Sequence, residues 1–215
     1  MTGKTTDIMM MAVLVVLVVM LSAGAVFIDD LIPSPSLPKA SAKVDPSLAR
    51  VSFGSNPNAS VHMLVFGDYE CANTKVDWEM IKRIRSDYGK KINLVWVHTP
   101  LDVHPHSQAA ARAVVCAQAQ GKFWEFSDVL FANQDRLDDG ALLEYAARIG
   151  LDQTVFRSCF YSSRAENKVR DDLVFALGHG IRGTPTYVIS GRWFEGVQDE
   201  GFLRGVLDSA VEAGQ

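Results

Sequence analysis

The sequence lacks any excess of positive charge: 21 Lys and Arg residues stand against 25 Asp and Glu residues, a formal net charge of −4. The basic residues are scattered, and no basic stripe interleaved with aromatic residues occurs along the chain. A protein that binds nucleic acid needs a basic face for the phosphates. We therefore exclude nucleic acid as a partner.

Cysteine is scarce, with three residues in 215, and zinc-site spacing is missing. His98, His104 and His106 lie close together in the sequence, but no cysteine or carboxylate joins them at the spacing of a zinc site. We expect these histidines to have structural or surface roles. Neither a metal ion nor a cofactor is expected.

One long apolar run is present, at residues 8–28, with no charge between Asp7 and Asp29. About 20 such residues span a bilayer as a helix. Small residues at 23–25 also fit a signal-peptidase site, so an uncleaved anchor, which we favour, and a signal peptide cleaved near Ala25 both stay open. Lys4 precedes the run and predicts a cytoplasmic N-terminus. The rest of the chain then faces an oxidising, extracytoplasmic compartment, the periplasm or the cell-envelope side.

Residues 29–58 are expected to form a flexible linker, because prolines recur there among serine and other small or polar residues. From Val61 the pattern changes to short apolar runs typical of buried strands, alternating with segments of helical spacing. Residues 59–215 therefore predict one α/β domain, in which a helical insert at about 104–180 interrupts the strands. The expected strands lie at 61–66, 92–97, 186–189 and 192–194, the last two as a hairpin.

Cys71 follows the first predicted strand and opens the next predicted helix. The free N–H groups of a helix N-terminus favour a thiolate, so this position is typical of a reactive cysteine. Asp68 and Glu70 oppose the negative charge and Lys75 favours it, so the net effect stays open. An inert buried cysteine is the alternative, which the order of strand, cysteine and helix disfavours.

Several segments resemble the DsbA family of thiol-disulfide oxidoreductases. They are Phe-Gly-Asp-Tyr-Glu-Cys at 66–71, Pro-Leu-Asp-Val-His-Pro at 100–105, the stretch 116–126, and Gly-Thr-Pro-Thr-Tyr-Val-Ile at 183–189. The resemblance runs in the family's order from about Val61 to the C-terminus. It implies a thioredoxin-like fold with an inserted α-helical subdomain. It also implies a cis Pro185, with Thr184 beside the sulfur, as the substrate-binding loop.

The sequence departs from the family at the active site itself. The family motif is Cys-x-x-Cys, whereas here Thr74 follows Cys71 at the second cysteine position. Threonine cannot resolve a mixed disulfide, although its hydroxyl can donate a hydrogen bond to a Cys71 thiolate. Cys116 and Cys159 both fall on apolar faces of predicted helices. In an exported protein such a pair is expected to form a structural disulfide, as the resemblance also implies, and two free buried thiols are the alternative.

These features predict a thiol-disulfide oxidoreductase that acts through a single nucleophile, Cys71. Its expected partners are the thiols or disulfides of exported proteins, with glutathione or a membrane redox partner as further candidates. The alternative is a redox-inactive module that binds extended peptides in the groove at Thr184 and Pro185. A third hypothesis, an iron–sulfur cluster shared between two chains through Cys71, conflicts with export.

Overall fold

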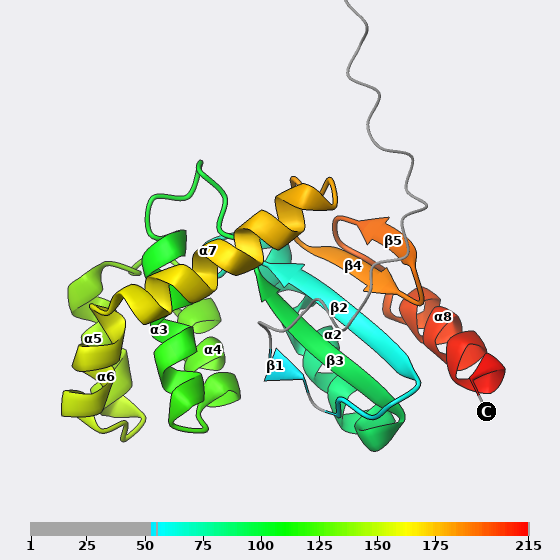
Figure 1. Ribbon diagram of the computed structural model, residues 1–215, viewed down its shortest axis with the longest axis horizontal. Coiled ribbons are helices and arrows are strands. Elements are labelled where there is room, and N and C mark those ends of the chain that lie inside the picture. The colour runs from blue at the N-terminus through cyan, green and yellow to red at the C-terminus, as the bar shows by residue number, and fades with distance from the viewer. Residues whose placement is uncertain (1–52, 55, 215) are drawn as a thin grey trace, which may run out of the picture. The chain divides into compact units, whose positions relative to one another are not determined.

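The structure, a computed structural model, describes residues 53–54 and 56–214 (Figure 1). All of these belong to the second of two compact units, Ala40–Gln215. Their helices and strands are β1 (Phe53–Gly54), β2 (Val61–Gly67), α2 (Ala72–Tyr88), the 3₁₀ helix η2 (Gly89–Lys91), β3 (Ile92–His98), α3 (Ser107–Ala119), α4 (Phe123–Ala132), α5 (Asp139–Arg148), α6 (Gln153–Phe160), α7 (Ser163–Gly178), β4 (Thr186–Ile189), β5 (Arg192–Glu195) and α8 (Glu200–Ala213).

The strands form one mixed sheet in the order β1-β3-β2-β4-β5. β2 and β3 are parallel and joined through α2, which makes the predicted strand–helix–strand unit, and the other pairs are antiparallel. Every residue of β3 and β4 is buried, as is every residue of β2 except His62. Short apolar runs without alternation are typical of strands covered on both faces.

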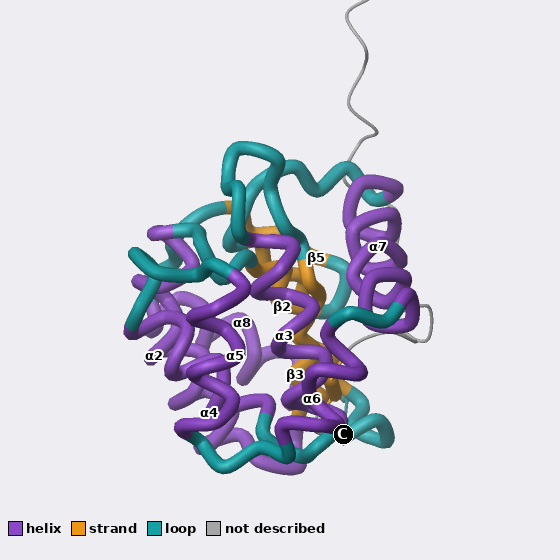
Figure 2. Tube along the Cα trace, turned by 90° about the vertical axis from the view of Figure 1, so that its left-hand side faces the viewer, coloured by secondary structure: helices purple, strands orange, loops and turns teal. Residues whose placement is uncertain are grey.

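Helices cover both faces of the sheet. Met63 and Val65 of β2 point into a large core that includes residues of α2, α8 and the helices α3–α6, whereas Leu64 and Phe66 point into a smaller core with Ala176 of α7. This division follows from the period of two in a strand. Figure 2 shows the sheet lying between α7 on one side and α2 and α8 on the other.

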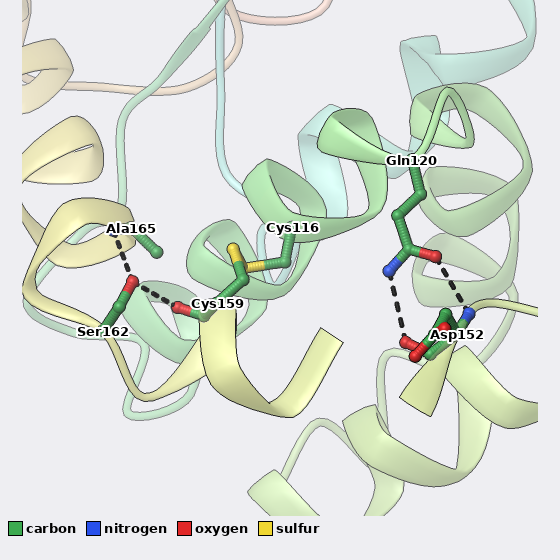
Figure 3. The surroundings of a disulfide bond; sticks show 6 residues. All are labelled: Cys116, Gln120, Asp152, Cys159, Ser162 and Ala165. Atoms are coloured by element: carbon green, nitrogen blue, oxygen red, sulfur yellow. Dashed lines mark hydrogen bonds between the residues drawn. A yellow bond between two sulfur atoms is a disulfide. The ribbon is translucent and has the colours of Figure 1, made fainter. Parts of the chain in front are cut away.

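The helical insert comprises α3 to α7 and lies between β3 and β4 in the chain. Asp138, Asp152 and Ser162 cap α5, α6 and α7, because each side-chain oxygen accepts a hydrogen bond from a backbone N–H of the first helical turn. A disulfide between Cys116 and Cys159 joins α3 to α6 (Figure 3), with 5.7 Å between the two Cα atoms.

The predicted fold class, an α/β domain with an inserted helical subdomain, is confirmed. The sheet begins earlier than expected, since β1 at Phe53–Gly54 lies within the range assigned to the linker and pairs with Trp96 and Val95 of β3. Two residues carry too little pattern to reveal a strand.

The apolar run at 8–28 and most of the expected linker lie outside the described residues. Within residues 53–54 and 56–214, no helix has both the length and the apolar character needed to cross a membrane.

Candidate active site

Cys71 lies where β2 gives way to α2 and occupies the N-cap position of that helix. Its backbone N–H donates to the carbonyl of Asp68, and its carbonyl accepts from Lys75 N, so a tight turn leads directly into the first helical bond. The residue is 7% exposed. A cysteine at this position faces helix N–H groups that have no partner within the helix, which is the setting that favours a thiolate.

The loop before β4 lies against the sulfur. The peptide bond between Thr184 and Pro185 is cis, and the Cys71 thiol donates to the Thr184 carbonyl over 3.3 Å. Thr186 pairs with Phe66 of β2, so the sheet register places the loop beside the end of β2. The structure therefore brings Cys71 beside the loop of Thr184 and Pro185, although these two residues follow Cys71 by 113 and 114 positions in the chain.

Thr74 is fully buried in the first turn of α2. Its hydroxyl makes no hydrogen bond to any described residue, and the same is true of the Thr184 hydroxyl. The expected bond from Thr74 to the Cys71 sulfur is absent in this state, in which the sulfur is a thiol that donates to the loop carbonyl. A thiolate cannot make that donation and needs donors of its own.

Cys116 and Cys159 lie in the insert and are bonded to each other. Cys71 is the free cysteine among the three. The chain therefore holds no second thiol that could attack a disulfide formed at Cys71.

The two acidic residues of the turn are tied to neighbouring backbone groups. The Asp68 carboxylate accepts from Glu70 N at 2.8 Å and from Leu101 N at 2.9 Å, and His104 Nδ1 lies 2.7 Å from it. Glu70 accepts from His106 N at 2.7 Å. The loop between β3 and α3, which contains Leu101, His104 and His106, therefore holds the active-site turn in place. No group of histidine, cysteine and carboxylate side chains in residues 53–54 and 56–214 is arranged to hold a metal ion.

Gly67, the last residue of β2, permits a close approach of the core. A Cβ atom at this position would overlap the indole ring of Trp96. Trp96 is fully buried and packs against the rings of Tyr69 and Phe131. Any side chain larger than hydrogen at position 67 would displace this aromatic cluster directly beneath the turn.

A buried charged cluster lies behind Tyr69, between β3 and α7. Asp172 accepts from His98 N at 3.2 Å and from Lys168 Nζ at 2.8 Å, and the His98 ring lies 5.9 Å from that of Tyr69. Burial raises the pKa of Asp172 to about 7, although Lys168 opposes the shift. Burial, with a smaller contribution from Lys168, lowers the pKa of His98 well below its usual value. His98 is therefore neutral at pH 7.

Sequence reasoning missed this cluster and also Gln134. The Gln134 side-chain amide lies in the connection between α4 and α5 and donates to the carbonyls of Tyr69 and Cys71. Both arrangements join segments more than 60 residues apart. No local periodicity or motif in the chain signals such contacts.

Comparison with known proteins decides the family. The DSBA-like thioredoxin domain matches residues 63–208. This chain belongs to that family. The fold agrees with solved structures: the thiol-disulfide exchange protein alpha-DsbA2 of Wolbachia pipientis has a TM-score of 0.66 at 24% identity, over 72% of this chain and 84% of that one. ScsC of Proteus mirabilis, in a transitional conformation, has a TM-score of 0.69 at 17% identity, over 98% and 97% of the two chains.

Curated relatives with higher sequence identity are longer proteins. The Na(+)/H(+) antiporter NhaA 3 of Salinispora tropica is 37% identical over 139 residues, which is 64% of this chain but 21% of that protein. The Na(+)/H(+) antiporter NhaA 1 of Mycobacterium sp. (strain KMS) is 36% identical over 169 residues, or 77% of this chain and 27% of that protein. This DSBA-like chain thus spans about a quarter of the length of these relatives.

Proposed function

We propose that this DSBA-like protein exchanges thiols and disulfides through Cys71 alone. The observation that carries the proposal is the position of the Cys71 sulfur, at the N-cap of α2 and 3.3 Å from the carbonyl of the cis-proline loop. A helix N-terminus stabilises the thiolate needed for attack. The loop preceding β4 offers backbone groups to an extended substrate segment.

The chemistry requires a second, external thiol. The Cys71 thiolate attacks one sulfur of a substrate disulfide, so a bond from Cys71 to that sulfur forms and the other sulfur leaves as a thiolate that takes up a proton. An external thiolate, from glutathione or a protein, then attacks the substrate sulfur of the mixed disulfide, so that a disulfide forms between the external and the substrate sulfur and Cys71 leaves as a thiolate. A second external thiolate attacks that disulfide, which frees the substrate thiol and leaves the two external thiols joined as a disulfide. The external thiol supplies the electrons. Cys116 and Cys159 take no part, since they are bonded to each other.

The proposed site of action is extracytoplasmic, at the membrane. The apolar run at 8–28 supports this, as does the Cys116–Cys159 disulfide, because such bonds persist in oxidising compartments. The names of the curated relatives, which are Na(+)/H(+) antiporters, further support a location beside a membrane. Exported proteins with thiols or disulfides are the proposed substrates.

The test is to incubate the full-length chain with oxidised glutathione and with a peptide disulfide, and to quench with acid. We expect mass spectrometry to find a mixed disulfide on Cys71 in the wild type and none in Cys71→Ser. Turnover of the peptide disulfide should require added glutathione. Absence of an adduct on the folded wild-type chain would contradict the proposal.

The alternative is a peptide-binding module without redox activity, which the threonine at position 74 favours. It predicts that Cys71→Ser binds a fluorescent extended peptide as tightly as the wild type. It also predicts no turnover by the wild type even with glutathione. Turnover that depends on Cys71 excludes this alternative.

A further inference from the structure

Gln134 reaches from the helical insert into the active-site turn. It lies in the connection between α4 and α5, and its Nε2 atom donates to the Tyr69 carbonyl at 2.8 Å and to the Cys71 carbonyl at 3.0 Å. An amide NH₂ group has two hydrogens, so both donors are used. The two acceptors lie on either side of Glu70, in the last residues before α2.

The two carbonyls belong to peptide units that fix the position of the nucleophile. The unit between Tyr69 and Glu70 is held at its other end, where Glu70 N donates to Asp68. The unit between Cys71 and Ala72 is the first of α2, and its carbonyl also accepts from Lys75 N. Gln134 therefore sets the orientation of the peptide that leads out of Cys71 into the helix, together with the N–H groups that stabilise a charge on the sulfur.

The chemistry of the side chain suits this task. An amide donates twice without carrying charge, whereas a carboxylate of the same shape has no donors at neutral pH. In the position of Gln134, a carboxylate would place an acceptor against two carbonyl oxygens. It would also add negative charge beside a sulfur that must become a thiolate.

We infer that Gln134 is a positioning residue for the reaction of Cys71, through which the packing of the inserted helices controls the reactivity of the nucleophile. This inference rests on the proposed function, because it concerns the same sulfur. The hydrogen bonds of Gln134 go to backbone carbonyls of the turn and not to the sulfur. It acts through the backbone of the turn.

The experiment compares two changes at position 134 with one matched control in the full-length chain. Gln134→Met keeps the length of the side chain and removes both donors, and Gln134→Glu removes them and adds a charge. The control is Gln120→Glu. The Gln120 amide also bonds to the backbone of another segment, but its partners are the N–H and carbonyl of Asp152 in the insert rather than the active-site turn (Figure 3).

The rate of Cys71 alkylation by iodoacetamide is measured from pH 5 to 10 for each chain, with melting curves to show that it is folded. We expect the rate at pH 7 to fall several-fold in Gln134→Met and roughly tenfold in Gln134→Glu, with the pH–rate profile displaced upward by about one pH unit in the latter. Gln120→Glu should follow the wild-type profile. Mixed-disulfide formation should slow in the same order.

Profiles of both Gln134 variants that superimpose on the wild type would overturn the inference, even if their melting temperatures fall, because lost packing alone would then explain them. If Gln134→Glu does not fold, Gln134→Met decides the question by itself. A wild-type chain that forms no mixed disulfide at all would instead overturn the proposed function. The two failures are therefore distinguishable.

Discussion

At the scale of single residues, the main departure from the Cys-x-x-Cys motif is Thr74, which occupies the position of the second cysteine. It lies three residues after Cys71 in the first turn of α2, and positions three apart share a helix face. The side chain is fully buried and its hydroxyl has no partner among the described residues. A buried hydroxyl without a partner is costly, which is consistent with a group that gains its partner in another state of the site.

We expect Thr74→Cys to convert the proposed single-thiol mechanism into a two-thiol one. A thiol at this position restores the Cys-x-x-Cys spacing and can attack a mixed disulfide at Cys71 from within the chain. The lifetime of the mixed disulfide with a peptide should fall by about tenfold or more without added glutathione, as followed by mass spectrometry after acid quench. Thr74→Ser, which keeps a hydroxyl, is the control. Equal lifetimes in wild type, Thr74→Ser and Thr74→Cys would contradict the expectation.

At the scale of secondary structure, the elements that carry the site are those with the clearest sequence patterns. The apolar runs of β2 and β3 and the hairpin at 186–195 lie where the patterns predict them. Such features depend on neighbouring residues alone. The charged cluster on α7 was not predictable, because Asp172 and Lys168 read as an exposed ion pair on a helix. Only the packing of α7 onto β3 buries Asp172 beside His98.

The buried Asp172 predicts an unusual pH dependence of stability. Its pKa is about 7 in the folded chain, raised mainly by burial, and about 4 in an unfolded one. Between these values the folded state holds the extra proton, so this residue makes the chain less stable as pH rises from about 4 to about 7. The neighbouring His98, with its lowered pKa, acts in the opposite direction below about pH 6.5. Lys168 and Tyr69 also face the cluster, and the exposed Asp171 adds a small repulsion that raises the pKa of Asp172.

Comparison with Asp172→Asn isolates the contribution of Asp172, since Asn does not titrate. The quantity to compare is the unfolding free energy of the variant minus that of the wild type. We expect this difference to be about 2–4 kcal/mol larger at pH 8 than at pH 4, because only the wild type loses the contribution of the Asp172 proton. Urea unfolding at the two pH values measures it. Asp171→Asn, a change at an exposed neighbour, is the control and should show little change. A difference between Asp172→Asn and wild type that does not vary with pH would show that Asp172 titrates as an ordinary carboxyl group.

At the scale of the whole described domain, the order of elements was predictable, but the contacts that join distant segments were not. Periodicity and motifs correctly predict that Cys71 begins a helix after a strand and that Pro185 is cis in the loop before a strand. Nothing local indicates that Gln134 bonds to the turn or that β1 extends the sheet. Those contacts depend on how the insert and the strands pack in three dimensions, and a polar side chain on a loop has many possible partners before the chain folds.

The Cys116–Cys159 disulfide also acts at this scale, because it closes a segment with a sequence separation of 43 residues across α3 and α6. On the chain-entropy account, a loop of this length stabilises the folded state by about 4 kcal/mol, and measured values are often smaller. We expect the double variant Cys116→Ala/Cys159→Ala to lose about 2–4 kcal/mol of unfolding free energy in urea. The control is urea unfolding of the wild type with a reductant that opens the disulfide, and its unfolding free energy should fall by a similar amount.

The same variant separates stability from chemistry. Neither cysteine of the bridge bonds to the active-site turn, which the insert contacts through Gln134, Ser127 and His106. Where the double variant is folded, Cys71 should therefore form mixed disulfides at the wild-type rate. A folded double variant in which Cys71 has lost its reactivity would show that the bridge holds the active-site turn in place. A pH–rate profile of Cys71 alkylation in that variant that matches the profile of Gln134→Met would show that the bridge acts by positioning Gln134.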